Sequence, residues 1–331
     1  MTAPNRKIRW GVLGCARIAR EAVIPALQRA GNSTLHALAS RDPAKLDAAR
    51  TRFGVTRTYP GYADLLRDPE VDAVYIPLPN ALHREWTIRA AEQGKHVLCE
   101  KPLALTAAEG RDMVAVGAAH GVTLMEAFMY RYTDRSRQVR DVLRSGALGE
   151  IRFVSATFNF LLANPASIKL RPELGGGSLY DVGCYPVNFI GMVADGPDPK
   201  AAGGARPDKV VVECVRPPGG IDLSFSALLR YPSGLGAALH CGFDAHLRTW
   251  AEITGTQGVL EVPDTFLDNA GALTLITGGE RREIPVAASD RYRLEVEDFA
   301  AALLLGRAPQ FGLAETLRNL EVTDRLLAAS R

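Results

Sequence analysis

The sequence has few of the features that mark secreted, membrane-spanning or nucleic-acid-binding proteins. No run of about 18 apolar residues occurs, so no transmembrane helix is expected. The five cysteines, at positions 15, 99, 184, 214 and 241, form no CxxC pair and are odd in number, which favours buried thiols in a reducing compartment. Lys and Arg (39) nearly balance Asp and Glu (37), so neither nucleic acid nor an anionic membrane is an expected partner.

Signals for export and for repetition are also missing. The first seven residues are polar, and residues 8–15 are too few and too interrupted by glycine to form the apolar core of a signal peptide. The chain contains no internal repeat and no low-complexity tract. Its 331 residues are 47% apolar and 23% charged, which is ordinary for a globular protein and long enough for two domains. We therefore expect a cytoplasmic protein.

Apolar runs and amphipathic helical patterns alternate over the first 125 residues. Strand-type runs occupy residues 7–13, 34–39, 71–76, 96–99 and 122–125. Helical patterns lie between them and end near residues 29, 52, 93 and 121. This alternation predicts βαβ units with right-handed crossovers, and therefore a parallel sheet with helices on its faces.

The pattern changes after residue 150. A long alternating run covers residues 151–160, and a helical stretch follows at 179–193. Further strand-type segments, most of them bounded by Gly or Pro, lie at 210–214, 222–231, 235–243, 250–255 and 259–262. They predict a large, mostly antiparallel open sheet with one face against helices. We place the domain boundary between residues 125 and 126. The closing helices, 294–305 and 314–329, could pack back on the first domain.

The turn after the first strand carries a dinucleotide fingerprint, Gly14-x-Ala16-x-x-Ala19. Gly14 permits the tight turn, Ala16 lets a pyrophosphate approach, and Ala19 lets the helix pack closely on the strand. The phosphates would lie at the helix N-terminus, so Arg17 and Ile18 are further candidates for cofactor contacts. Because Ala16 replaces the usual middle glycine, a plain tight turn is the alternative.

The tip of the second strand favours NADP over NAD. An NAD enzyme normally carries an acid there to hold the ribose 2′-hydroxyl, and this chain has Ser40 and Arg41 instead. A hydroxyl and a guanidinium suit a 2′-phosphate, and Lys45 could add a third positive contact. Asp42, just beyond, leaves NAD open.

Two loops follow the third and fourth predicted strands. In the first, residues 77–83, two prolines fix an extended backbone, and Leu78, Asn80 and His83 are candidates for a wall under the ribose and nicotinamide. The alternatives are that Asn80 only caps the next helix and that His83 is a helix-surface histidine.

The second of these loops contains Glu100-Lys101-Pro102. Pro102 restrains Lys101 to an extended conformation. The carboxyl end of a buried parallel strand is where open α/β sheets bind their ligands. Lys101 is therefore the first candidate for catalysis, with Glu100 beside it at the cofactor. The alternative is a surface loop with a solvated Glu-Lys pair.

Residues 175–188 form the second informative stretch. Glycines 175–177 let the backbone pass close to another group, and Ser178 is expected to cap a helix. Asp181 and Tyr185 lie four residues apart, on one helical face. A carboxylate and a phenol that face Lys101 make a proton-transfer set, because an adjacent ammonium lowers the tyrosine pKa toward working pH. The alternative is a buried tyrosine bonded to a surface aspartate.

With these motifs together, the sequence resembles the glucose–fructose oxidoreductase/inositol dehydrogenase (Gfo/Idh/MocA) family over nearly the whole chain. The resemblance is carried by residues 10–19, 79–83, 100–102, 125–131 and 175–188. It implies a Rossmann domain (1–125) and a second α+β domain (126–331) whose open sheet often serves for dimer formation. It also implies that the family's lysine corresponds to Lys101 and its helix aspartate to Asp181.

Tyr185 resembles one branch of that family. Inositol-type members have a histidine four residues after the helix aspartate, whereas NADP-xylose and dihydrodiol dehydrogenases are similar to this chain in having tyrosine. The implied function is an NADP-dependent sugar dehydrogenase in which Tyr185 takes the hydroxyl proton, Lys101 holds that oxygen and Asp181 orients the sugar or the lysine. Arg131 and Arg171 are candidates for contacts with the cofactor and the substrate, or are solvated arginines.

Two other functions remain open. One is an NADPH-dependent ketosugar reductase of a biosynthetic pathway; the other is a lyase that retains its nicotinamide or an inactive regulator. The intact set of Lys101, Asp181 and Tyr185 argues against the regulator. We expect a carbohydrate substrate, no metal site, and a homodimer or homotetramer formed through the C-terminal sheet. The loop 161–169 should shape the substrate pocket.

Overall fold

The computed structural model describes residues 6–198 and 201–330, and the chain divides into two compact units. The first unit combines the chain up to Ala104 with Ala108–Met129 and Asp290–Leu313. The second holds Leu105–Ala107, Tyr130–Ser289 and the chain from Ala314 onward. Compared with the predicted division at 125/126, the first unit extends to Met129 and also includes the first of the two closing helices.

The first unit is built on a six-stranded parallel sheet, which confirms the predicted doubly wound α/β fold. The strand order is β3-β2-β1-β4-β5-β6, in which the chain reverses direction across the sheet between β1 and β4. The strands are β1 (Ile8–Leu13), β2 (Ser33–Ala39), β3 (Arg57–Tyr59), β4 (Ala73–Ile76), β5 (His96–Glu100) and β6 (Leu124–Ala127). Their apolar side chains are buried because helices cover both faces.

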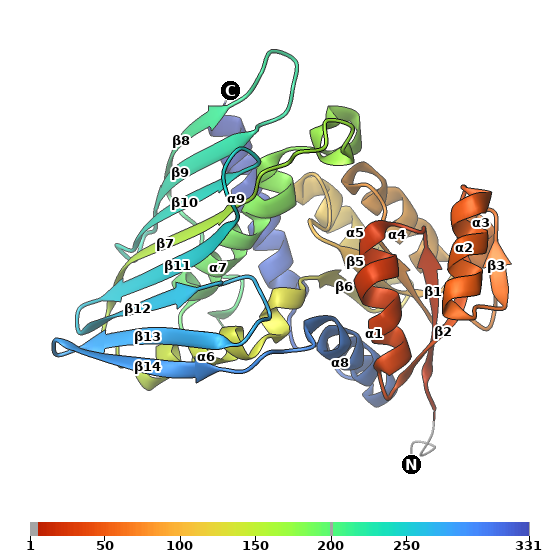
Figure 1. Ribbon diagram of the computed structural model, residues 1–331, viewed down its shortest axis with the longest axis horizontal. Helices are drawn as coiled ribbons and strands as arrows, with labels where there is room; N and C mark the ends of the chain where they lie inside the picture. Colours follow the sequence, from red (N-terminus) through yellow and green to blue (C-terminus); the bar gives the residue numbers. More distant parts are fainter. Residues whose placement is uncertain (1–5, 199–200, 331) are drawn as a thin grey trace. The chain divides into compact units, whose positions relative to one another are not determined.

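Helices from distant parts of the chain cover the two faces of this sheet. On one face α1 (Ile24–Arg29) and α8 (Arg291–Leu305) contact each other and the sheet; on the other, α3 (Tyr62–Leu66) contacts α4 (His83–Glu92). The remaining helices of this unit are α2 (Pro43–Phe53), η2 (Asn80–Leu82) and α5 (Ala107–Ala119). Figure 1 shows α8, in blue, beside the red α1.

Two helices predicted as continuous begin instead with a widened π-type turn. These turns are η1 (Ala19–Val23), before α1, and η6 (Leu179–Gly183), before α7 (Cys184–Asp195). A proline follows each turn closely, Pro25 in the first case and Pro186 in the second. Proline has no N–H and its ring crowds the carbonyl four residues earlier, so the preceding turn opens.

The second unit is built on an eight-stranded, mostly antiparallel sheet of order β14-β13-β12-β11-β7-β10-β9-β8, as predicted. The one parallel pair in the described sheet is β7–β10. Its strands are β7 (Ile151–Asn159), β8 (Lys209–Val215), β9 (Ser224–Arg230), β10 (Gly236–Gly242), β11 (Arg248–Gly255), β12 (Gly258–Pro263), β13 (Gly271–Thr277) and β14 (Glu280–Val286). The hairpin β13–β14 extends the sheet beyond the predicted strands.

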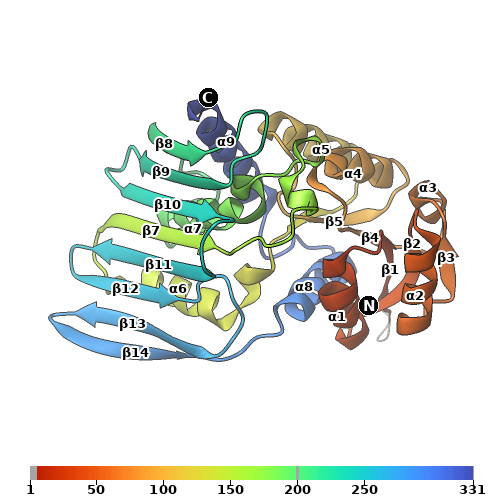
Figure 2. The ribbon, with the colours of Figure 1, turned by 45° about the horizontal axis from the view of Figure 1, so that its top comes forward.

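One face of this sheet is covered and the other is open. Helices α6 (Asp134–Ser145), α7 and α9 (Leu313–Ala329) lie along the same face in both views (Figures 1 and 2). No described helix lies on the opposite face. Within the described chain, every helix is too short or too polar to cross a lipid bilayer.

Candidate functional site

The first turn of the parallel sheet has the conformation that a dinucleotide fingerprint requires. Gly14 is buried with φ +116°, a region that favours glycine. A Cβ at this position would lie 3.2 Å from Leu78 Cδ2 and 3.6 Å from Tyr62 Oη. The Gly14 N–H donates to Ala39 O at 2.8 Å, which ties the turn to the tip of β2. The turn therefore leaves backbone, and no side chain, where a pyrophosphate would approach.

At the tip of β2 the carboxylate of Asp42 already contacts Lys45. Asp42 Oδ1 accepts the backbone N–H of Lys45 (3.1 Å), which caps α2, and its Oδ2 lies 3.2 Å from Lys45 Nζ. The Lys45 backbone N–H, helped by its ammonium, holds the pKa of the Asp42 carboxyl below its ordinary value. Ser40 Oγ accepts the Asp42 N–H at 3.2 Å. Lys45, predicted as a third cofactor contact, thus has its charge matched by Asp42.

Arg41 and Arg17 are both exposed. The Arg41 guanidinium lies 5.6 Å from the ring centroid of Tyr62, and no carboxylate in the described chain pairs with it. Arg17 Nε lies 4.0 Å from Glu21 one helical turn on, with a side chain 79% exposed, so this contact contributes little. Arg41 therefore keeps its charge available to a ligand.

His83 is completely buried and joins two loops at the carboxyl ends of strands. Its Nδ1 lies 2.9 Å from Pro102 O, after β5, and its Nε2 lies 2.8 Å from Leu78 O, after β4. Burial lowers the pKa of the ring and the two carbonyls oppose that shift. The interpretation of His83 as a helix-surface histidine is wrong. The prediction that Asn80 caps the next helix is also wrong, because neither η2 nor α4 has a side-chain cap.

The loop that carries Lys101 is held by two carboxylates, those of Glu100 and Glu126. Glu100 Oε1 accepts the Tyr75 hydroxyl at 2.6 Å, and Glu126 Oε1 accepts the Leu103 N–H at 2.9 Å. The Lys101–Pro102 peptide bond is cis. Lys101 follows β5 at the same edge of the parallel sheet as Gly14, Ser40 and Leu78, because each of these residues follows the carboxyl end of its strand.

A second buried carboxyl lies in the electrostatic field of Glu100. Glu295 of α8 is 1% exposed, and its Oε1 has no hydrogen-bond partner in the described chain. Burial, followed by the negative charge of Glu100, raises the pKa of Glu295 well above its ordinary value. Burial and the same charge also raise the pKa of Tyr75. The first unit thus holds a carboxyl that resists ionisation close to the predicted catalytic loop.

In the second unit, two glycines of the 175–177 run are required by close approach. A Cβ on Gly176 would lie 2.5 Å from Lys169 O, and one on Gly177, where φ is +130°, would lie 2.5 Å from Asp222 Oδ1. Ser178 does not cap the helix as predicted. Its hydroxyl donates to Asp222 Oδ2 at 2.7 Å, and the same oxygen accepts the Leu179 N–H at 2.7 Å. Asp222, from the segment before β9, therefore satisfies the helix start.

Asp181 and Tyr185 lie in η6 and at the start of α7. Tyr185 is 3% exposed, and its ring centroid lies 5.1 Å from that of Phe158 and 5.4 Å from that of Phe266. Asp181 Oδ2 lies 2.5 Å from the Nζ of Lys169, whose ammonium is 5.0 Å from the Phe160 ring centroid. Lys169 was not among the predicted site residues, although it ends the loop 161–169 that was expected to shape the pocket.

The two remaining predicted arginines differ in environment. Arg131 is buried in the second unit, where its guanidinium donates to Glu315 Oε2 at 2.6 Å and to Asn188 Oδ1 at 3.2 Å. Arg171 is exposed, with Nε 3.1 Å from Glu173 Oε1. Arg131 therefore holds α9 against α7, whatever else it contacts.

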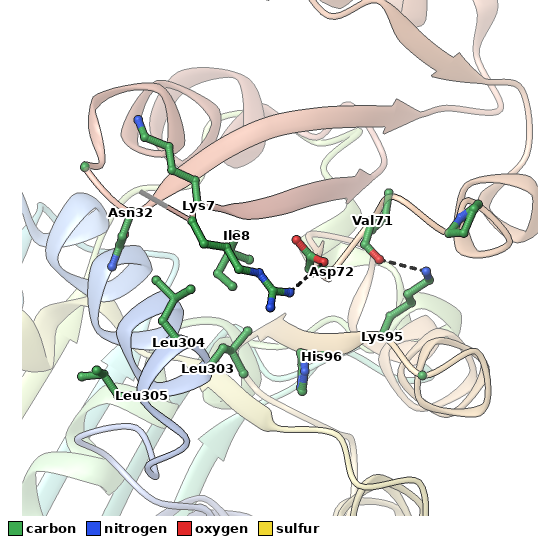
Figure 3. A pocket seen from close by; sticks show the side chains of 14 residues that line it. Lys7, Ile8, Asn32, Val71, Asp72, Lys95, His96, Leu303, Leu304 and Leu305 are labelled. Carbon is green, nitrogen blue, oxygen red and sulfur yellow. Dashed lines mark hydrogen bonds and ion pairs between the residues drawn. The ribbon is translucent and has the colours of Figure 1, made fainter. Parts of the chain in front are cut away.

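A cleft of about 870 Å³ opens at the other end of the parallel strands. Figure 3 shows it between the starts of β1 and β5 and the leucines that end α8. Its polar groups are largely paired: Lys95 Nζ donates to Asp68 O (2.7 Å) and Val71 O (2.8 Å), and Arg6 lies 3.6 Å from Asp72. This cleft is at the opposite edge from Gly14 and Lys101, so the predicted chemistry does not belong to it.

One group in the described chain has the spacing of a metal site, His36 with Asp68 and Glu70. Arg57 already lies against both carboxylates, 3.2 Å from Asp68 Oδ2 and in close contact with Glu70. The guanidinium provides the positive charge that these acids require, so the arrangement is an ion-pair cluster beside β2.

Comparison with known proteins agrees with this architecture. A doubly wound parallel sheet with a glycine turn after its first strand is typical of dinucleotide-binding folds. Residues 8–128 match the model of an oxidoreductase family with an NAD-binding Rossmann fold, and residues 136–261 match the GFO/IDH/MocA C-terminal domain. The chain belongs to the Gfo/Idh/MocA oxidoreductase family.

Three similar proteins illustrate the range of that family. The chain is 37% identical to D-xylose 1-dehydrogenase (NADP(+)) 2 of Haloferax volcanii, covering 96% of this chain and 95% of that one. It is 30% identical to trans-1,2-dihydrobenzene-1,2-diol dehydrogenase of Xenopus tropicalis, covering 96% and 97%. The structure of KijD10, a 3-ketoreductase from Actinomadura kijaniata in complex with NADP and TDP-benzene, superposes with a TM-score of 0.90 at 31% identity over 98% of both chains.

The buried carboxyl of α8 generates a prediction on stability. A group whose pKa is raised in the folded state keeps a proton that the unfolded chain loses, so the free energy of unfolding falls as pH rises above the ordinary glutamate pKa. Glu295→Gln removes this loss, and urea unfolding from about pH 5 to about pH 8 should show a flatter dependence for the variant, which is the more stable protein at the upper end.

Glu92→Gln, at an exposed position of α4, is the control and should leave the slope of the parent. Equal slopes for the Glu295 variant and the parent would show that Glu295 ionises normally in the folded protein.

Proposed function

We propose that the protein is an NADP-dependent oxidoreductase that transfers a hydride between nicotinamide and a sugar carbinol carbon, in the manner of an aldose 1-dehydrogenase. The observation that carries the proposal is the placement of Lys101, held by a buried loop at the same sheet edge as the Gly14 turn. Full-length similarity to D-xylose 1-dehydrogenase (NADP(+)) 2 supports the substrate class. The cysteines are unpaired in the described chain, which supports a reducing, cytoplasmic location.

The preference for NADP rests on the charges at the tip of β2. Arg41 is exposed and has no carboxylate partner in the described chain, while Asp42, which could hold a ribose hydroxyl, is engaged as a helix cap and ion pair. A guanidinium binds a phosphate with parallel hydrogen bonds and strong charge complementarity. The cofactor in the KijD10 complex is also NADP.

The proposed chemistry divides between a phenol and an ammonium. When bound, the cofactor's nicotinamide supplies the hydride acceptor or donor. Tyr185 takes the proton of the reacting hydroxyl, and Lys101 binds the same oxygen and favours the phenolate form. Asp181 accepts a hydrogen bond from the sugar. Leu78, Asn80, His83, Glu100 and the residues of the 14–18 turn line the cofactor in this proposal, and Arg131 and Arg171 retain their proposed contacts.

Reduction of a nucleotide-linked ketosugar is the second candidate. It is favoured by one observation, the superposition on KijD10, a 3-ketoreductase bound to TDP-benzene, over nearly the whole chain. NADP+ reduction with a panel of aldoses and polyols, and NADPH oxidation with TDP-linked ketosugars, separate the two. Turnover of free aldoses supports the dehydrogenase; turnover confined to nucleotide-linked ketones supports the reductase.

The catalytic roles predict a specific pattern of loss. Lys101→Met and Tyr185→Phe should each reduce kcat by about 100-fold or more, because each removes a group that acts on the reacting proton. NADP+ affinity, measured by titration calorimetry, should persist in Tyr185→Phe. Full activity in both variants would end this assignment.

Lys169 gives a further prediction for the same reaction. Its ammonium holds Asp181 by a charge-assisted hydrogen bond of 2.5 Å, so its removal should misplace the carboxylate. Lys169→Met should lower kcat/KM for the sugar by about 10- to 100-fold, while Lys169→Arg retains most of it. If Lys169→Met has the same kcat/KM as the parent, Asp181 acts without the contact to Lys169.

We also propose that the protein is a homodimer formed through the open face of the eight-stranded sheet. Phe153, Val211, Val215 and Leu228 are exposed there, with Val211 opposite Leu228 on neighbouring strands. A depression of about 370 Å³ lies over the same strands. Contiguous exposed apolar side chains on a sheet are typical of an interface, and a two-fold contact is the commonest closed arrangement.

Leu228→Glu should convert this dimer into monomers, because two-fold symmetry brings the new charge to the interface twice. Light scattering after size-exclusion chromatography gives the mass. Leu305→Glu, at an exposed leucine of the first unit, is the matched control and should leave the dimer intact. A monomeric parent protein, or a dimeric Leu228 variant, contradicts the proposal.

A further inference from the structure

Tyr62, which opens the short helix α3, lies under the predicted NADP-selective arginine. Its ring is 7% exposed, and the Arg41 guanidinium carbon lies 5.6 Å from the ring centroid. The ring also packs against Trp86 of α4, edge to face, with centroids 5.0 Å apart and planes at 89°. Tyr62 is therefore a fixed aromatic surface, and Arg41 rests against it.

The same side chain reaches the phosphate-binding turn. Tyr62 Oη lies 3.6 Å from the position that a Cβ on Gly14 would occupy. Gly14 in turn bonds to the end of β2, one residue before Ser40. Tyr62 thus lies beside both places where the adenosine half of a dinucleotide would bind, the first turn and the tip of the second strand.

An arginine with no packing partner would bind a 2′-phosphate less tightly at this position. Arg41 is exposed, and its long side chain would lose rotamer freedom when it bound a phosphate. A guanidinium packed on an aromatic ring is attracted by the ring electrons and has fewer conformations to lose. Because NAD has no 2′-phosphate, this advantage applies to NADP alone.

We propose that Tyr62 sets the preference for NADP over NAD by holding Arg41 against its ring, ready for the 2′-phosphate. Tyr62 acts through Arg41 and is a positioning residue for cofactor selection. The ring carries this effect. The hydroxyl, which points toward the turn shared by both cofactors, affects NADP and NAD alike. The inference rests on the proposed function only in its choice of Arg41 as the 2′-phosphate contact.

The test separates the ring from the hydroxyl. Dissociation constants for NADP+ and NAD+ are measured by titration calorimetry on the parent, Tyr62→Phe and Tyr62→Leu, with no sugar present. Tyr62→Phe should leave the NADP+/NAD+ affinity ratio within about twofold of the parent, and Tyr62→Leu should lower it about fivefold through weaker NADP+ binding. An equal effect of both variants on the ratio, or an unchanged ratio in Tyr62→Leu, overturns the inference.

A second pair of variants guards against a folding defect at this buried position. Arg41→Ala removes the guanidinium, so it should lower the ratio in the parent, and Tyr62→Leu should have little further effect in the Arg41→Ala background, because Tyr62 acts only through Arg41. Additive effects overturn the inference. Circular dichroism identifies any unfolded variant; if Tyr62→Leu is unfolded, Tyr62→Met takes its place, and an unchanged ratio in Tyr62→Met overturns the inference.

Arg41→Ala distinguishes the failure of this inference from that of the proposed function. If Arg41→Ala leaves the ratio unchanged, Arg41 is no 2′-phosphate contact and the proposed basis of NADP selection is wrong. If Arg41→Ala lowers the ratio and Tyr62→Leu does not, NADP selection stands and only the role of Tyr62 is overturned.

Discussion

One buried imidazole connects the two loops on which the cofactor end of the first unit depends. His83 contacts Leu78 O after β4 and Pro102 O after β5, so the loop after β4 and the loop that carries Lys101 cannot move apart without leaving a buried polar group unpaired. A neutral ring donates to only one of these carbonyls. One of the two contacts is therefore a hydrogen bond, and at the other the ring nitrogen only packs against the carbonyl.

In the second unit a buried carboxylate, in place of an imidazole, holds the backbone that carries the candidate catalytic residues. Asp222 accepts the Ser178 hydroxyl and the Leu179 N–H, and thereby fixes the start of the helical segment that presents Asp181 and Tyr185. Arg131 and Glu315 tie α9 to this region with a buried ion pair. In both units the candidate catalytic side chains stand on backbone that is held by buried polar contacts between residues far apart in sequence, which costs stability unless every partner is present.

Local pattern predicted most strands of both sheets and the residues that follow them, but it missed β3 and the hairpin β13–β14. Gly14 was predicted from its place directly after an apolar strand. Lys101 was predicted from the strand before it and the proline after it. Helix α6 was missed because only Val139, Val142 and Leu143 of its twelve residues are apolar, and its buried face includes Arg135, which is 1% exposed and donates to Leu267 O. Helix α3 has five residues, too few for a helical period to appear.

One shared reason explains why Lys169, Tyr62 and Asp222 were not predicted as site residues. Lys169 is twelve residues from Asp181, and Tyr62 is twenty-one from Arg41; neither pair shares an element or a spacing rule. Asp222 replaces the expected Ser178 cap from 44 residues away. Ser178 was a reasonable candidate because serine is a common N-cap, but tertiary contacts gave its hydroxyl a stronger acceptor. Such pairings become visible only once the chain is folded.

The first unit is not a contiguous stretch of chain. Helix α8 returns to it after the whole eight-stranded sheet has been made, and Phe299 of that helix packs on Trp10 of β1 with ring centroids 5.4 Å apart. A ribosome therefore releases most of the nucleotide-binding half before α8 covers its part of the sheet face beside α1, and that part stays bare until α8 has been made. Recombination between relatives that exchanged the halves at residue 130 alone would pair that bare part of the sheet with a foreign helix.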